Sequence, residues 1–239
     1  MASRIFWILL LIAPFTYGNT LTIGTMSYDP PLSIKINEKN NFYGFDIDIM
    51  SEICKRIQAT CNYKPFTFSQ LFTAVDKREI DLAIASISIS KEREQLYLFS
   101  SPYYFSQAQF VTISKSPIST LEALTGKRIG LIGIPTKELV LKLYKGDVTV
   151  IEYLDIPAQL NGLNQKEVDA VVIDKGVVQY WFANSDDLYK IILPFVNYGT
   201  GYGIMTNKDQ SALINQVNDA LQKMKADKTY DTIYAKYFG

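Results

Sequence analysis

Apolar and polar positions in the first half of the chain alternate in a way that predicts strands separated by helices. Residues 21–25 favour a strand, and residues 46–57 place apolar side chains at helical spacing, with Asp46 as a plausible N-cap. Residues 81–88 (DLAIASIS) have the near-continuous apolar body of a strand buried on both faces. We also expect a strand at 62–66 and helices at 68–77 and 90–94. This pattern is typical of an α/β fold.

The same pattern returns in a second unit between about residues 114 and 196. We expect strands at 128–132, 149–153 and 170–173 and helices at 135–144, 158–166 and 176–182. A glycine-punctuated stretch at 199–205 then leads into an amphipathic helix with Leu213, Val217, Leu221 and Met224 on one face, and a short aromatic-faced helix ends the chain. Two α/β units of similar size are therefore expected, without a tight sequence repeat.

The first eighteen residues have the features of an export signal. Arg4 gives a positive start, residues 5–13 form an apolar run, and Pro14 breaks that run shortly before Gly18. A membrane-spanning helix needs about 20 apolar residues, so the run is too short to be one. We expect residues 1–18 to be a secretory signal peptide, with a buried N-terminal helix as the alternative. Because no cysteine lies near the cleavage point, a lipoprotein is not expected.

Composition narrows the classes of function. Lys+Arg and Asp+Glu both number 24, so the formal net charge is zero, which argues against a nucleic-acid binder that relies on a basic face. The chain has no histidine, which excludes Ser-His-Asp and Cys-His catalysis and every His-ligated metal site. Only two cysteines are present, so a Cys-rich metal site is excluded as well. We expect no metal and no cofactor, and the charge balance leaves small neutral or zwitterionic partners open.

The two cysteines agree with export. Cys54 falls late in an expected helix and Cys61 just before an expected strand, so the chain can turn back to join them. An oxidising compartment favours a bridge between such a pair. A loop this small adds roughly 2–3 kcal/mol of stability on the entropic model. The alternative is two buried free thiols.

Three motifs resemble a known family. They are the runs GFDIDI at 44–49, SISISKER at 86–93 and TYDTIYAKYF at 229–238. They resemble the signatures of the polar amino-acid solute-binding proteins of bacterial ABC importers, and in particular of the arginine and lysine/arginine/ornithine binders. The similarity covers the whole chain after the export signal, with the motifs in the right order.

The resemblance implies a type II periplasmic-binding-protein fold in the α/β class. Each lobe would be a mixed sheet flanked by helices, and two crossover strands near 108–112 and 198–203 would act as the hinge. Lobe 1 would combine residues 19–108 with 201–239, and lobe 2 would span 109–200. A free L-amino acid would be trapped between the lobes of a periplasmic monomer, and the closed form would be read by the membrane permease of an ABC transporter.

The clamp for the ligand carboxylate can be argued from physical chemistry as well. A free amino acid carries a carboxylate and an ammonium, and burying either one unpaired is costly. Arg93 suits the carboxylate because its guanidinium fork binds two oxygens at once, and it lies just inside a helix that Ser90 is placed to cap. Ser86 and Ser88 are one strand period apart and so face the same side. Alone, these residues are equally well explained as a solvated arginine and two strand serines; the resemblance implies the clamp.

The ammonium anchor is expected in the second unit. Asp174 follows the buried strand at 170–173, at a carboxyl end where α/β proteins bind ligands, although a helix N-cap explains it too. The resemblance implies that Asp174 pairs with the ligand amine. It also implies that Thr136 serves as both N-cap and clamp donor, and that the backbone carbonyl of Ala85 meets the amine.

The residues expected to line the pocket for the ligand side chain match the family pattern less well than those of the clamp. The resemblance implies that the ring of Phe68 stacks over the ligand, although a phenylalanine beside Phe66 also fits a core position. Many family members read aromatic-Pro-Pro-Phe after the first strand, whereas residues 28–32 here read YDPPL. An ungapped alignment puts Asp29 on the aromatic position, and a shift by one residue restores Tyr28 as the ring.

Asp29 decides the expected ligand. It offers a carboxylate for a guanidinium, so we favour arginine or another basic amino acid. Lys137 stands beside Thr136 and argues against a cationic ligand, so glutamine or another neutral polar amino acid is the main alternative.

Two other classes of function stay open at this stage. One is a periplasmic dehydratase on the same scaffold, which the intact Asp174 and the lack of an evident acid–base pair disfavour, so we expect no catalytic residue and no enzyme. The other is a ligand-binding protein that feeds a sensory receptor.

Overall fold

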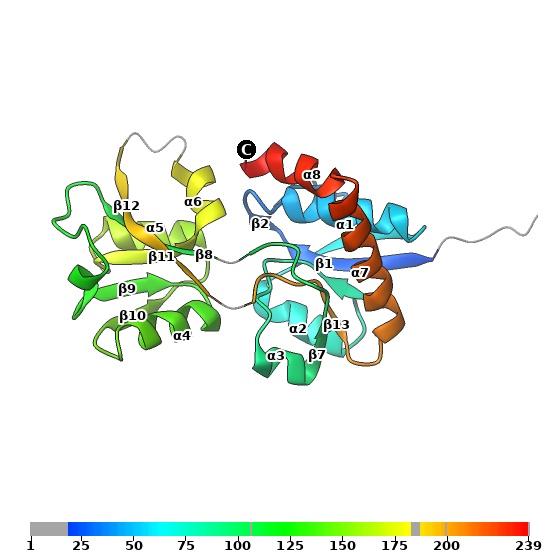
Figure 1. The fold of residues 1–239 in the computed structure, drawn as a ribbon, viewed down its shortest axis with the longest axis horizontal. Helices are drawn as coiled ribbons and strands as arrows, with labels where there is room; N and C mark the ends of the chain where they lie inside the picture. Colours follow the sequence, from blue (N-terminus) through cyan, green and yellow to red (C-terminus); the bar gives the residue numbers. More distant parts are fainter. Residues whose placement is uncertain (1–18, 106, 183–186, 199, 239) are drawn as a thin grey trace, which may run out of the picture.

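The computed structural model describes residues 19–105, 107–182, 187–198 and 200–238, and these form two lobes side by side (Figure 1). The expected signal peptide, residues 1–18, lies outside the described residues. Each lobe is a five-stranded mixed sheet flanked by helices, which confirms the expected fold class. No helix among the described residues is both long enough and apolar enough to cross a membrane.

Lobe 1 has the strand order β5-β1-β6-β13-β7. Strands β1 (Thr20–Met26), β5 (Thr60–Phe66) and β6 (Leu82–Ala83) are parallel, and β13 (Met205–Asn207) is antiparallel to both β6 and β7 (Tyr97–Phe99). A small second sheet joins β2 (Tyr28–Asp29), β3 (Ser33–Lys35) and β4 (Phe42–Tyr43). The helices of this lobe are α1 (Phe45–Arg56), α2 (Phe68–Asp76), α3 (Lys91–Leu96), α7 (Ser211–Ala226) and α8 (Thr229–Phe238).

Lobe 2 has the strand order β10-β9-β11-β8-β12. Strands β9 (Arg128–Leu131), β10 (Thr149–Glu152) and β11 (Ala170–Asp174) are parallel, whereas β8 (Gln107–Ile113) is antiparallel to its neighbours β11 and β12 (Tyr189–Asn197). Its helices are the short 3-10 turn Glu122–Leu124, α4 (Ile134–Leu143), α5 (Ile156–Asn164) and α6 (Lys175–Phe182). Strand β11 is buried along its whole length, as the continuous apolar run predicts.

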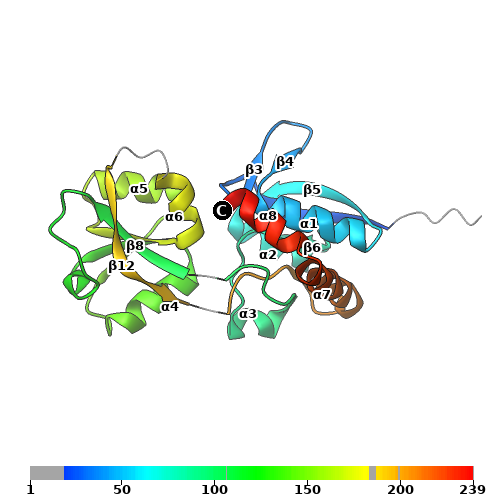
Figure 2. The same cartoon turned by 45° about the horizontal axis from the view of Figure 1, so that its top comes forward.

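Two chain segments cross between the lobes side by side (Figure 2). At the lobe 2 end Gln107 pairs with Asn197, and at the lobe 1 end Tyr104 pairs with Tyr202. The first crossover therefore comes before the expected 108–112 stretch, which is part of β8 inside the lobe 2 sheet.

The long strand expected at 81–88 is wrong: β6 holds only Leu82 and Ala83. Ser86 has a φ of 53°, a left-handed conformation that no regular strand contains, so the chain leaves the sheet. Beyond it, Ser88 pairs with Tyr202 through one isolated bridge. The apolar run therefore predicts burial correctly but not secondary structure, because the residues after Ala83 are buried in a loop.

The N-cap expected at Asp46 is wrong as well. Helix α1 is capped by Gly44, whose φ of 141° favours glycine. A Cβ at Gly44 would also meet the carbonyl oxygen of Leu32 at 2.1 Å, so this turn requires glycine. Asp46 is then the second residue of the helix, and its side chain is fully buried.

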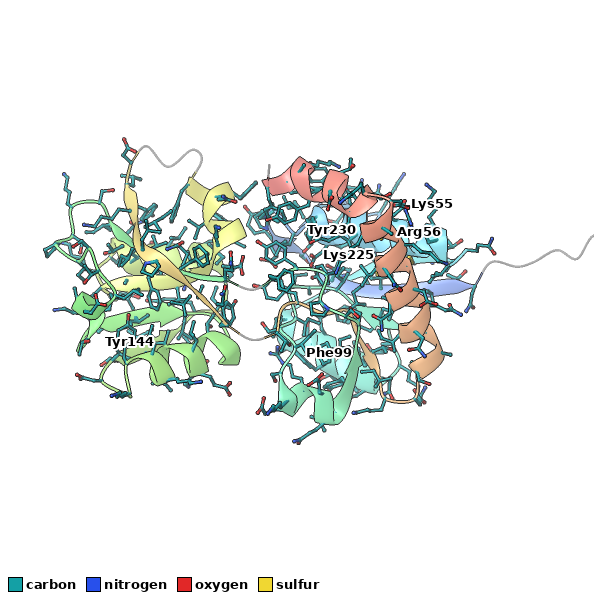
Figure 3. The ribbon with its side chains drawn as sticks, in the orientation of Figure 1. Lys55, Arg56, Phe99, Tyr144, Lys225 and Tyr230 are labelled. Carbon is teal, nitrogen blue, oxygen red and sulfur yellow. A yellow bond between two sulfur atoms is a disulfide. The ribbon has the colours of Figure 1, made fainter. Side chains whose placement is uncertain are left out.

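The C-terminal helices complete lobe 1. Helix α7 buries Ile214, Val217, Ala220, Leu221 and Met224, and the expected Leu213 is partly buried against the same core. From α8, four aromatic rings surround the ring of Phe45 at centroid distances of 5.1–6.2 Å, those of Tyr230, Tyr234, Tyr237 and Phe238. Lys225, near the end of α7, lies 5.7 Å from the ring centroid of Tyr230 (Figure 3). The aromatic face expected at the end of the chain thus packs on α1.

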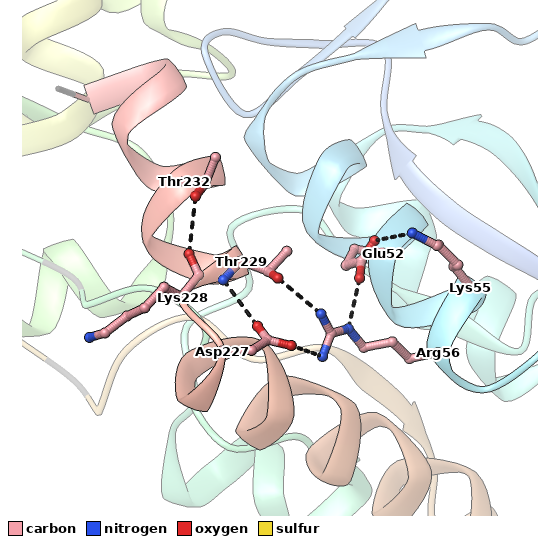
Figure 4. A network of polar contacts seen from close by, with 7 residues as sticks. All are labelled: Glu52, Lys55, Arg56, Asp227, Lys228, Thr229 and Thr232. Atoms are coloured by element: carbon pink, nitrogen blue, oxygen red, sulfur yellow. Dashed lines mark hydrogen bonds and ion pairs between the residues drawn. The ribbon is translucent and has the colours of Figure 1, made fainter.

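Two devices fix α1 to its surroundings. The disulfide between Cys54 and Cys61 joins its last turn to β5, with the Cα atoms 6.1 Å apart, which confirms the expected bridge. Arg56 joins the same turn to the junction of α7 and α8 (Figure 4). Its guanidinium donates to Glu52 at 2.8 Å, to Asp227 at 2.7 Å and to Thr229 at 3.0 Å.

Candidate functional site

Both sheets turn the carboxyl ends of their parallel strands toward the crossovers. In lobe 2, Asp174 at the end of β11 pairs with Ala108 at the start of β8. In lobe 1, Ala83 at the end of β6 pairs with Met205, the first residue of β13 after the second crossover. The loops after these strands therefore meet where the lobes meet, which is the usual ligand position in an open α/β sheet.

Arg93 lies on the lobe 1 side of this region, in α3. The helix is capped by Ser90, whose hydroxyl accepts from the backbone N–H of Arg93 at 3.3 Å, as expected. The guanidinium donates to the carbonyl of Ser88 at 2.8 Å and lies 5.4 Å from the ring centroid of Phe68 and 5.2 Å from that of Phe72. Burial lowers the pKa of Arg93, but an arginine stays charged. A partly buried guanidinium with one hydrogen-bond acceptor in the described chain can take a carboxylate.

Ser86 joins two carboxylates. Its hydroxyl donates to Asp29 at 2.7 Å, and its backbone N–H donates to Asp46 at 3.3 Å. The strand alternation that was expected to align Ser86 with Ser88 does not exist, because the strand ends at Ala83. Ala85, the neighbouring residue, is fully buried.

The two carboxylates form an acidic wall. Burial raises the pKa of Asp29 to about 6, although the hydrogen bond from Ser86 opposes that shift. Burial, followed by the charge of Asp29, raises the pKa of Asp46 well above its ordinary value. Among the described residues, no lysine or arginine forms an ion pair with either one. Asp46 was missed as a site residue because its place in a helix start suggested capping.

Tyr28 and Phe68 line different parts of the region. Tyr28 is 54% exposed and meets Trp181 of α6 edge to face, with centroids 6.4 Å apart, so it touches lobe 2. Phe68 meets Phe72 at 5.5 Å and lies beside the guanidinium of Arg93. Sequence reasoning missed Trp181 and Phe72, and no motif marks either.

Asp174 is the lobe 2 counterpart. Its carboxylate is buried and accepts four hydrogen bonds at 3.0–3.2 Å, from the hydroxyls of Tyr104 and Tyr202 and the backbone N–H groups of Gln107 and Gly176. Burial outweighs these bonds and raises the pKa of Asp174 to about 6. The bond from Gly176 is the helix-capping contact that the sequence left open.

A cavity of about 720 Å³ lies between the lobes beside Asp174. Three of the four donors to its carboxylate also line this cavity, namely Tyr104, Gln107 and Gly176. Helix α8 contributes further aromatic rings, those of Tyr230, Tyr234 and Phe238. Residues of both lobes line this cavity, but Asp174, Arg93 and Asp29 are not among them, so the cavity lies apart from the candidate clamp.

Thr136 does not cap α4, so that expectation is wrong. The helix begins at Ile134, with Gly133 as its cap and a proline in its first turn. Thr136 lies two residues inside the helix, and its hydroxyl donates to the carbonyls of Ile132 at 2.6 Å and Gly133 at 2.9 Å. Proline suits this first turn because it needs no N–H donor there, so the start of the helix shifts upstream.

The neighbouring Lys137 is paired. Its ammonium lies 2.5 Å from Glu152 at the end of β10. That contact removes the main sequence argument against a cationic ligand. Among the described residues, no group of three or more Cys, Asp or Glu side chains is placed to hold a metal ion.

The chain is similar to known proteins in both sequence and fold. Residues 21–239 match the family described as "Bacterial extracellular solute-binding proteins, family 3". The chain is 31% identical over 236 residues to "ABC transporter arginine-binding protein 1" of Escherichia coli strain K12. The aligned region covers 95% of this chain and 96% of that protein.

Solved structures give the same result. The chain is similar, with a TM-score of 0.87 and 40% identity, to an "arginine 3rd transport system periplasmic binding protein from Legionella pneumophila", over 92% of this chain and all of that one. It is also similar to "An ancestral arginine-binding protein bound to glutamine", with a TM-score of 0.80 and 34% identity over 92% of this chain and 98% of that one.

Proposed function

The chain belongs to family 3 of the bacterial extracellular solute-binding proteins, and from this premise we propose that it is the arginine-binding component of an amino-acid ABC importer. Its relatives include arginine-binding proteins of ABC transporters. The proposal adds a periplasmic location, a monomeric state, and a membrane permease as the partner that receives the ligand.

One observation supports arginine above all: the carboxylates of Asp29 and Asp46 share a serine and have no cationic partner in the described chain. Asp46 is fully buried, Asp29 is partly exposed, and the charge of Asp29 acts on Asp46, so a cationic side chain that reaches Asp29 is favoured. A guanidinium suits this position because its planar fork can bind carboxylate oxygens in pairs.

The remaining charges suit the two ends of an amino acid. In the proposed complex, Arg93 binds the ligand carboxylate together with groups from Ser88 and Thr136. Asp174 binds the ammonium from the other lobe, with the carbonyl of Ala85 beside it. The ring of Phe68 covers the ligand side chain, and Tyr28 closes the pocket toward α6.

Lobe closure follows from this division of roles. A ligand held by Arg93 in lobe 1 gains the contact with Asp174 only when the lobes approach. This difference in affinity between the open and closed forms drives closure, and the permease then reads the closed form. Tyr28 and Trp181, already in contact across the lobes, are the first rings that closure would shift.

Glutamine is the second candidate. The similar ancestral arginine-binding protein was solved with glutamine bound, so one scaffold of this kind accepts both ligands. A glutamine would use the same clamp and anchor, and its amide would hydrogen-bond to Asp29.

Calorimetric titration of ligand-free protein beginning at Asn19 tests the proposal, with arginine, lysine, ornithine, citrulline and glutamine as ligands. Tight arginine binding with much weaker citrulline binding would support it, because citrulline has nearly the shape of arginine without the charge. Tighter binding of glutamine than of arginine would keep the clamp and overturn the acidic pocket. No binding of any amino acid would overturn the function itself.

A further inference from the structure

The acidic wall of lobe 1 has unusual hydrogen bonding. Ser86 gives its two donors to two different carboxylates, one to Asp29 and one to Asp46, while its backbone is held in the left-handed conformation. The side chains of Asp46 and Tyr103 are both buried, and the hydroxyl of Tyr103 interacts with the carboxylate of Asp46. A buried carboxylate close to a second carboxylate is still costly to ionise, and a proton on the pair lowers that cost.

In the part of the chain that the structure describes, no positively charged group is among those that act on the pair. Asp29 comes from β2, Asp46 from α1 and Tyr103 from the segment before the first crossover. The other titratable group that interacts with Asp46 is Tyr63 of β5. Burial raises the pKa of Tyr63 to about 12 and that of Tyr103 well above its ordinary value, so both are neutral at physiological pH. Two carboxylates in such surroundings cannot both ionise easily.

We propose that Asp29 and Asp46 hold one proton between them while the pocket is empty, and release it to solvent when the guanidinium of arginine enters. This inference rests on the proposed function. The O–H bond of the shared carboxylic acid breaks, the proton passes to the buffer, and the guanidinium pairs with the carboxylate of Asp29. Asp46 is a positioning residue: it holds the backbone of Ser86, whose hydroxyl donates to Asp29, and the charge of Asp29 in turn raises the pKa of Asp46.

The consequence is a preference for ligand charge that depends on pH. The pKa of Asp29 is about 6 without ligand, and a bound cation lowers it. Arginine binding therefore releases protons near pH 6, and its affinity rises as the pH increases through that range, by up to about tenfold per unit for one proton. Citrulline brings no charge, so its affinity stays nearly constant. The preference for arginine over citrulline grows with pH.

Calorimetry in two buffers of different ionisation enthalpy measures the released protons directly. We expect release of about half a proton per arginine near pH 6 and more at lower pH, little release with citrulline, and a clearly smaller release with arginine in the Asp46→Asn variant. Asp48→Asn is the matched control, since Asp48 lies on the same helix but contacts Lys236 and Tyr237 on the outside. If Asp46→Asn does not fold, the comparison of arginine with citrulline on the wild-type protein decides.

The outcomes separate this inference from the function. Tight arginine binding without proton release, or with the same release in Asp46→Asn as in Asp48→Asn, would overturn the shared proton and leave the arginine-binding function standing. If arginine does not bind even at pH 8, where both carboxylates are most readily ionised, the proposed function fails and the inference fails with it.

Discussion

The two lobes present their charged groups to the region between them in different ways. In lobe 1, the guanidinium of Arg93 has one acceptor in the described chain, and the pair Asp29 and Asp46 shares the donors of one serine. In lobe 2, the carboxylate of Asp174 already accepts four hydrogen bonds, and the hydroxyl of Thr136 donates to two carbonyls. The charged side chains of lobe 1 can accept further hydrogen-bond partners, whereas Asp174 and Thr136 of lobe 2 already have their partners within the described chain.

The difference indicates an order of events. A ligand that meets lobe 1 forms hydrogen bonds with side chains that have few partners in the described chain, so few existing bonds are lost when it binds there. A ligand that meets lobe 2 must compete with donors that the chain supplies, so part of the gain from its contacts is lost. We expect the amino acid to dock on lobe 1 first and lobe 2 to close afterwards.

The Arg93→Ala variant should have the largest effect. It leaves the ligand carboxylate buried without its cation, so we expect every amino acid to bind about 3–5 kcal/mol more weakly. Titration calorimetry checks the loss. Arg78→Ala is the control, because Arg78 pairs with Asp209 on the exposed surface of the same lobe. An unchanged dissociation constant would remove Arg93 from the clamp and with it the contrast between the lobes.

The Asp174→Asn variant should cost less, about 2–3 kcal/mol for every amino acid, although it too removes a charged anchor. The reason is that the ligand ammonium has to share the carboxylate with donors such as Tyr104 and Tyr202. The same titrations check this, with Asp169→Asn as the control, since Asp169 pairs with Arg128 away from the crossovers. A loss of binding free energy equal to that of Arg93→Ala would show that the existing hydrogen bonds of Asp174 do not weaken its contact with the ligand.

The disulfide distinguishes the lobes by stability. Replacing Cys54 and Cys61 with serine should lower the free energy of unfolding of lobe 1 by roughly 2–3 kcal/mol and leave lobe 2 unchanged. Trp181 is the only tryptophan after residue 18 and lies in lobe 2, so its fluorescence follows that lobe during denaturant unfolding while circular dichroism follows both. Two curves that shift together would show that the lobes unfold as one unit.

More of the fold than of the site could be predicted from the sequence. The alternation of apolar runs predicted the two α/β units, and the cysteine spacing with the export signal predicted the bridge of Cys54 and Cys61. Predictions from neighbouring residues alone were wrong where a segment distant in sequence packs close to the chain. Asp46 was expected as a cap, but Gly44 takes that place because the chain at Leu32 passes too close for a Cβ.

The site residues that were missed show the same limit. Trp181 was not expected, and it is far in sequence from Tyr28, which was, so their contact depends on how the lobes are placed. The role of Asp46 depends on Ser86, whose left-handed backbone carries its N–H to a helix forty residues earlier. Neither the contact nor the backbone angle leaves a pattern in the sequence.

The Thr136→Val variant should have the smallest effect, a loss of at most about 1 kcal/mol in amino-acid binding. The hydroxyl of Thr136 is already bonded to the carbonyls of Ile132 and Gly133, so only its backbone N–H, in the first turn of α4, is left to donate to a ligand carboxylate. Valine keeps that N–H and the shape of the side chain. Calorimetry with arginine checks this, and Thr136→Ser, which keeps the hydroxyl, should bind as the wild type does. A loss as large as that of Asp174→Asn would show that the hydroxyl leaves its carbonyls when the lobes close, and lobe 2 would then be as ready for ligand as lobe 1.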